Sequence, residues 1–150
     1  MNTPDEVAYH MALAEGFLSE AEQDKDLKRW RSCVDNAQLS AENSGKSVLA
    51  LFQIVPKSHD PAKEIAVIIR NQRLPDSIRD KLQQLLPDLL ALGLREHFLT
   101  DYGDETTYTL PWDLFTQESG QEALGAARSS IAKARGVIDS VARWRAGESK

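Results

Sequence analysis

The sequence predicts an all-α fold, an antiparallel up-and-down bundle of about five helices, and three observations lead to this prediction. Apolar residues recur every three or four positions through most of the 150 residues. Residues that favour helix starts stand before these segments, as Asp60 and Pro61 do. No segment of the sequence shows the strict alternation typical of a strand. We expect a single domain over residues 1–150, with a frayed tail over residues 146–150.

The first helix is expected to begin at Thr3 and Pro4 and to run to about Gln23. Its apolar face is formed by residues at helical spacing, which are Val7, Met11, Ala14, Leu18 and Ala21. A short charged turn follows. A second, longer helix is then expected over residues 27–54. It should end there because Pro56 follows.

The second helix carries two features around which the rest of the chain is organised. The middle of its apolar stripe holds only small residues, namely Ala37, Ala41 and Gly45. Such residues let another helix come close, either within the subunit or across a dimer axis. Beside the stripe runs a polar row at i, i+4 and i+8, formed by Gln38, Glu42 and Lys46. The row predicts either a surface ion pair worth about 0.3–0.5 kcal/mol or part of a ligand site.

Three further helices are expected after the second. The third covers about residues 60–73, and the fourth covers about residues 75–99 with a kink or a break at Pro87. Residues 101–115 lack periodicity and predict a long loop, a kind of segment that often carries function. The last helix begins after Thr116. Its apolar stripe comprises Leu124, Ala127, Ile131, Ala134, Ile138 and Val141.

Composition excludes several classes of protein and site. The single cysteine, Cys33, cannot form an intramolecular disulfide, and the N-terminus lacks a signal-peptide pattern, so we expect a cytoplasmic protein. No apolar run approaches the roughly 20 residues that span a membrane. A net charge of -5 opposes a general role in coating nucleic acid. His10, His59 and His97 lack the spacing of metal ligands, and we expect neither a metal nor another cofactor.

Two polar groups remain as candidate sites. The first lies on the second helix and comprises Asn36, Gln38, Glu42 and Lys46. The second lies over residues 95–105, at the end of the fourth helix and in its exit loop, and includes Arg95, His97, Asp101 and Tyr102. The second group is typical of a helix end followed by a solvated acidic turn. The aromatic residues nearby, Tyr108 and Trp112, instead favour a ligand site.

A basic cluster near the start of the second helix is a weaker candidate. It comprises Lys25, Lys28, Arg29 and Arg31, and further cations lie along the last helix. Such charges are typical of solvated faces and of helix ends. Trp30 stands beside the cluster, where an aromatic ring could stack on a nucleic-acid base or close the end of the core.

Together, the two polar groups resemble those of a HEPN domain. The resemblance covers about residues 9–138, and three segments carry it, which are Asn36-Ala37-Gln38-x-x-x-Glu42-x-x-x-Lys46, His59-Asp60-Pro61 and residues 92–102. HEPN domains are helical bundles that usually dimerise, and they include RNA-cleaving toxins, partners of small nucleotidyltransferases and modules that bind nucleotides. The resemblance therefore implies a homodimer. It also implies a nucleotide or RNA site lined by Asn36, Glu42, Lys46, Arg95, Asp101 and Tyr102.

The ribonuclease members of the family carry an Arg-polar-x-x-x-His motif, often followed after one residue by Tyr. Arg95 and Tyr102 match this motif, but Thr100 stands where the histidine would be. Threonine does not titrate near neutrality and cannot act there as a general acid or base. A metal-independent endoribonuclease toxin would therefore have to use Arg95 and Tyr102 with His97, three residues before the expected position.

Thr100 and the acidic residues around it favour a non-catalytic module over this ribonuclease. Such a module would bind a nucleotide or RNA, or pair with a nucleotidyltransferase in a toxin–antitoxin system. In those pairs the nucleotidyltransferase modifies the tyrosine of the motif, so the resemblance implies modification at Tyr102. The endoribonuclease is the alternative, and a structural dimer with a vestigial cleft is a third hypothesis.

Overall fold

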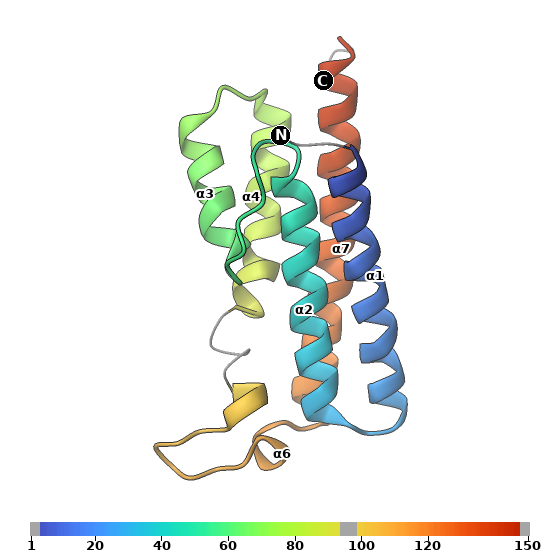
Figure 1. Cartoon of the computed structure of the whole chain (residues 1–150), viewed down its shortest axis with the longest axis vertical. Helices are drawn as coiled ribbons and strands as arrows, with labels where there is room; N and C mark the ends of the chain where they lie inside the picture. Colours follow the sequence, from blue (N-terminus) through green and yellow to red (C-terminus); the bar gives the residue numbers. More distant parts are fainter. Residues whose placement is uncertain (1–3, 94–98, 148–150) are drawn as a thin grey trace.

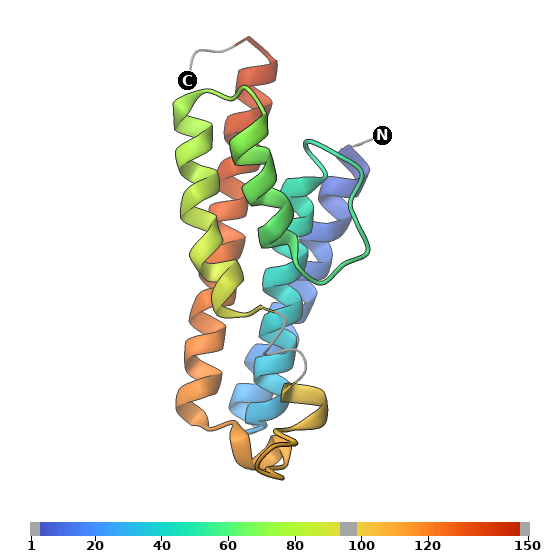
Figure 2. The ribbon, with the colours of Figure 1, turned by 90° about the vertical axis from the view of Figure 1, so that its left-hand side faces the viewer.

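The computed structural model describes residues 4–93 and 99–147 and confirms the all-α fold. Its long helices lie side by side (Figure 1), and they are α1 (Pro4–Asp26), α2 (Trp30–Leu49), α4 (Asp76–Ala91) and α7 (Gln117–Arg145). Each of these runs opposite to the one before it, as an up-and-down bundle requires. Figure 2 shows α4 against α7 and α1 against α2. α3 (Pro61–Asn71) packs outside this layer, against α2 and α4.

The predicted starts of α1, α3 and α7 are confirmed as far as they fall on described residues. Asp60 caps α3, because its carboxylate accepts a hydrogen bond from Lys63 N at 3.4 Å, and Pro61 is the first helical residue. Thr116 caps α7 in a reciprocal box with Ser119. α1 includes Pro4 as predicted, while the expected cap at Thr3 lies outside the described residues.

Both predicted boundaries of α2 are wrong by a few residues. α2 begins at Trp30 rather than Leu27, because Lys28 has a φ of 60°, which a right-handed helix cannot contain. α2 ends at Leu49 rather than Ile54. The residues that follow form turns closed by short i→i+3 hydrogen bonds, which tighten the end of the helix before the chain leaves it.

The prediction for α4 is also wrong at its end. The helix stops at Ala91 rather than near Leu99, because Leu92 leaves the helical region at φ -118° and ψ 46°. It does not break at Pro87, although the proline ring removes one backbone donor. Pro87 and Gln83 are not buried, so the carbonyl that loses its partner lies on the outer side of the helix.

The predicted loop over residues 101–115 has more structure than the sequence indicated. Residues 99–102 are helical, and α6 (Pro111–Leu114) is a single helical turn. Between them, Asp104 and Thr109 exchange backbone hydrogen bonds of 2.9 and 3.0 Å across an antiparallel bridge. The bridge closes a turn over residues 105–108 and holds it at one end of the bundle (Figure 1).

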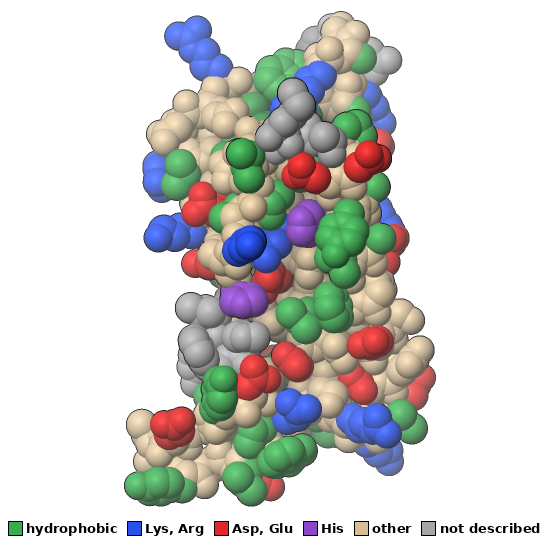
Figure 3. All heavy atoms as spheres, viewed as in Figure 1, with side chains coloured by type: hydrophobic (Ala, Val, Ile, Leu, Met, Phe, Trp, Pro, Cys, Tyr) green, Lys and Arg blue, Asp and Glu red, His purple; other side chains and the backbone are tan. Residues whose placement is uncertain are grey.

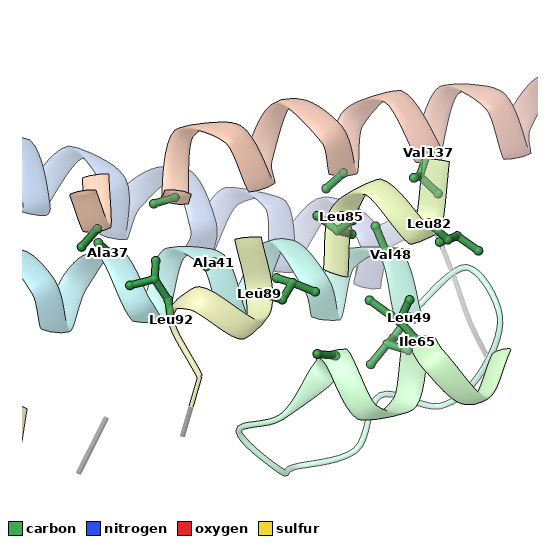
Figure 4. Packing of buried hydrophobic residues seen from close by; sticks show 14 of the residues in the cluster. Ala37, Ala41, Val48, Leu49, Ile65, Leu82, Leu85, Leu89, Leu92 and Val137 are labelled. Atoms are coloured by element: carbon green, nitrogen blue, oxygen red, sulfur yellow. The ribbon is translucent and has the colours of Figure 1, made fainter. Parts of the chain in front are cut away.

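The core explains the small residues of α2. Leucines of α4 and Val137 of α7 lie in the same buried cluster as Ala37 and Ala41 (Figure 4). A Cβ atom added at Gly45 would lie 2.8 Å from Pro61 Cγ, so the stripe lets α3 pack closely within the subunit. Across residues 4–93 and 99–147, no helix combines the length and apolar character that a membrane crossing requires.

Candidate functional site

The polar row of α2 forms a buried ion-pair network rather than the surface pair that the sequence allowed. Glu42 is only 5% exposed. Its carboxylate accepts hydrogen bonds from Lys46 Nζ at 2.9 Å and from Gln38 Nε2 at 3.1 Å. His59, from the connection between α2 and α3, places Nδ1 3.0 Å from Glu42 Oε1. One carboxylate therefore joins two turns of α2 to the segment that leads into α3.

This network keeps Glu42 charged. Burial alone would raise the pKa of Glu42, but the hydrogen bond and charge of Lys46, with the hydrogen bonds of Gln38 and His59, lower it below its ordinary 4.5. The positive charge of Lys46 is largely compensated by Glu42 within the chain. The network can fix the position of His59. A role for Glu42 and Lys46 in ligand binding remains a prediction.

Asn36 lies apart from this network. Its Nδ2 donates a hydrogen bond of 2.8 Å to Asp24 Oδ2, which ties α2 to the last turn of α1. Glu42 faces His59, whereas Asn36 faces α1. The structure therefore brings Glu42 and Lys46 together, and it directs Asn36 to a different neighbour.

Thr100, the residue at the position of the motif histidine, is completely buried. Its hydroxyl donates to Asp35 Oδ1 at 3.2 Å. Its backbone carbonyl accepts a hydrogen bond of 2.9 Å from Arg31 Nη1. Both partners come from the first turns of α2. Thr100 thus anchors the segment after α4 to α2, and a role for Asp35 was not foreseen from the sequence.

The other predicted residues of this segment have different surroundings. Tyr102 is 66% exposed and Asp101 is exposed, one beside the other at the end of the short helical segment. Arg95 and His97 lie outside the described residues. The grouping of Arg95, Asp101 and Tyr102 with the network around Glu42 remains a prediction.

Histidines lie on the same broad face of the molecule as cationic side chains (Figure 3). His10 Nδ1 is 3.1 Å from Asn43 Oδ1, a contact between α1 and α2 that the sequence did not indicate. In the part of the chain that is described, no three His, Cys, Asp or Glu side chains are placed to hold a metal ion.

A pocket lies where α2 begins, at the end of the bundle that holds α6. It has a volume of about 320 Å³ and is lined by residues 28–32, Trp112 and Phe115. The guanidinium of Arg31 stacks over Trp112, with its Cζ atom 5.9 Å from the ring centroid. The sequence indicates the basic cluster and the neighbouring Trp30, and most of the cluster lines this pocket together with Trp30. Only the fold brings Trp112 to this position.

A larger cavity of about 930 Å³ lies toward the other end, between the start of α1, the end of α2 and the last turns of α7. Its walls are mainly apolar, as Met11, Phe52 and Ile138 illustrate. Apart from two cations of α7, Arg135 and Arg145, its lining includes none of the residues that the sequence indicated as candidates for a site. Its size therefore does not make it the candidate site.

Comparisons with known proteins agree with this architecture. The family model described as HEPN domain matches residues 7–143. The crystal structure of TT1696 from Thermus thermophilus is similar, with a TM-score of 0.71 and 21% sequence identity. The match covers 91% of this chain and 99% of that chain, and at this identity it supports the fold. No curated protein matches the chain significantly.

Proposed function

We propose, from the premise that this chain belongs to the HEPN domain family, that it acts as a module that binds a nucleotide or RNA without cleaving it. The module acts as a homodimer in this proposal. Family membership supports the ligand class. The environment of Thr100 supports the absence of cleavage.

Thr100 carries the argument. General acid–base catalysis needs a titrating group within hydrogen-bond reach of the reacting atoms. At the position of the motif histidine, this chain has a hydroxyl that is 0% exposed and that donates to Asp35. A side chain enclosed in this way meets no phosphate backbone, and threonine has no suitable pKa. The ribonuclease alternative would then depend on His97.

The experiment incubates the purified protein with a mixed RNA pool in the presence of a chelator, and measures both cleavage and binding. We expect intact RNA with the wild type and with the Arg95→Ala and His97→Ala variants. We also expect a measurable shift of RNA or nucleotide in a binding assay. Cleavage that survives the chelator and disappears in His97→Ala would overturn the proposal in favour of the endoribonuclease.

Exposure of Tyr102 supports a second candidate function, that of a partner for a nucleotidyltransferase of the toxin–antitoxin type. Tyr102 is 66% exposed, which suits a hydroxyl that another enzyme must reach. We expect incubation with such an enzyme and its nucleotide to add one nucleotidyl group to Tyr102, detectable by mass spectrometry of the intact chain. Tyr102→Phe should remain unmodified, and modification of that variant would contradict the assignment.

A further inference from the structure

We propose that the pocket at the start of α2 binds a phosphorylated nucleoside, with the base stacked on Trp112 and the phosphate held by Lys28 and Arg29. The nucleoside is either free or the terminal unit of a single RNA strand. The ligand class rests on the proposed function. The location rests on the pocket itself. Its lining contains no residue of the Arg95–Tyr102 motif and none of the polar row of α2.

The pocket has the size and the walls that such a ligand needs. Its volume of about 320 Å³ lies at the lower end of the range of roughly 300–1,000 Å³ found for small-molecule sites. One wall is formed by residues 28–32, and another by Trp112 and Phe115. A planar ring can therefore lie against an aromatic wall while its phosphate faces a basic wall.

The basic wall has cations that no described carboxylate neutralises by direct contact. Within the described chain, no carboxylate forms an ion pair with Lys28, Arg29 or Arg31. Arg31 Nε is buried and makes no hydrogen bond within the described chain. The other nitrogens of Arg31 are fixed by the Thr100 carbonyl and by Ser32 Oγ. The guanidinium is thus positioned with one donor unused by the described chain.

The start of α2 adds to this charge. The first turn of this 20-residue helix contains no acidic residue, and Arg29 at the N-cap makes no side-chain cap. The first backbone N–H groups of a helix have no intrahelical partner and carry the positive end of its dipole. α3 and α7, in contrast, have Asp60 and Thr116 as side-chain caps. At α2, cations occupy the place of a cap, an arrangement that suits an anion.

The aromatic wall has an accessible ring. Trp112 is 69% exposed, although burial of so large an apolar side chain would ordinarily be favourable. Trp30 is different, because it packs so closely on Gly120 that a Cβ atom there would lie 2.5 Å from the indole ring. Trp112 is therefore the ring on which a base can stack, and Arg31 already stacks against it.

Acidic residues near the pocket confine the favourable contact to one phosphate group of the ligand. Asp26 and Asp113 are exposed and lie close in sequence to the two walls of the pocket, and the whole chain has a net charge of -5. A long polyanion would meet this negative charge beyond the pocket. A single phosphate can contact the basic wall without approaching these carboxylates, while its base lies on the aromatic wall.

The test measures binding of a 3′-labelled, 5′-phosphorylated single-stranded RNA of ten nucleotides by fluorescence anisotropy, with adenosine 5′-monophosphate as competitor. We expect Trp112→Ala to weaken binding about tenfold or more and Trp112→Phe to retain most of it. Arg29→Gln should reduce the slope of log K against log salt by about 1. Arg143→Gln is the matched control, because Arg143 is an exposed cation on α7 that pairs with Asp139.

The outcomes separate this inference from the proposed function. If the wild type binds and the Trp112→Ala and Arg29→Gln variants bind equally well, the pocket is wrong while the proposed function stands. If the wild type binds neither probe, both fail. Competition by the free nucleotide identifies a nucleotide site, and RNA binding without such competition identifies a strand end. Coincident urea-unfolding curves for all variants show that the changes are local.

Discussion

At the scale of single residues, Glu42 shows how the fold preserves a charge in the interior. Burial opposes ionisation, but Lys46, Gln38 and His59 all place hydrogen-bond donors on the carboxylate. The pKa of Glu42 is therefore lowered in the folded chain. A lowered carboxyl pKa contributes stability that is present above the unfolded pKa, and this stability is lost as the pH falls through the folded pKa.

Glu42→Gln tests this balance. The amide keeps the shape of the side chain but leaves Lys46 without its counter-charge, and we expect a loss of roughly 3 kcal/mol in the free energy of unfolding at pH 7. The loss should shrink as the pH falls below 4.5, because the wild-type carboxylate then becomes protonated as well. Urea unfolding of both proteins from neutral pH down through this range measures it. A difference that stays constant over this range would contradict the ion-pair explanation.

At the scale of elements, the contact between α2 and α3 depends on the absence of a side chain at Gly45. A Cβ atom at this position would lie 2.8 and 2.9 Å from carbons of Pro61 and 3.2 Å from Leu89 Cδ1. Carbon atoms ordinarily approach to about 3.5–4.0 Å. Pro61 is the first residue of α3, so its ring can move only if the start of that helix moves with it.

We therefore expect Gly45→Ala to destabilise the protein by about 1–3 kcal/mol, although alanine is the better helix former. Gly125→Ala is the control, since nothing lies within 4 Å of a Cβ atom at Gly125, on an exposed part of α7. There we expect a gain of up to about 1 kcal/mol. Thermal unfolding of both variants provides the comparison, and equal shifts in the two would contradict the steric explanation.

Helix starts that carry a side-chain cap were predictable from the sequence, whereas the start of α2 and the end of α4 were not. Asp60 and Thr116 act through local hydrogen bonds that the residue type itself indicates. The start of α2 depends instead on the positive φ of Lys28, a residue that carries no such preference. The end of α4 at Ala91 follows from Leu92, whose type would equally suit a continued helix.

The site was predictable only in part, for a similar reason. The spacing of Gln38, Glu42 and Lys46 indicates one face of a helix, and the structure places these three together. Contacts between distant segments leave no local pattern. The hydrogen bond from Thr100 to Asp35 and the stacking of Arg31 on Trp112 depend on how the segment after α4 folds back onto α2.

At the scale of the whole molecule, α2 is the element that connects the others. It contacts α1, α3, α4, α6 and α7, and most of its residues are buried. The network of Glu42 lies in the later half of α2, and the basic pocket lies at its start, so both depend on this helix. A change that loosens α2 should therefore affect both sites at once.

Cys33 reports on this central packing. It is completely buried, and its Sγ faces Gly120 O of α7 at 3.7 Å. Burial, with the negative charge of Asp24, raises the pKa of the thiol to about 11, so roughly one thiol in a thousand is ionised at pH 8 even if a reagent reaches it. Exposure requires α7 to move away from α2, because Gly120 of α7 lies close to both Cys33 and Trp30 of α2.

We therefore expect Cys33 to react slowly with an aromatic disulfide reagent in native buffer at pH 8, and at once in concentrated urea. Below the unfolding transition, the labelling rate should rise with urea in parallel with the global equilibrium, because opening around Cys33 breaks the extensive packing of α7 on α2. Stopped-flow labelling alongside circular dichroism measures both quantities. A fast rate that does not depend on urea would show that the start of α7 opens alone. The basic pocket, whose Phe115 lies just before that start, would then be the least stable part of the domain.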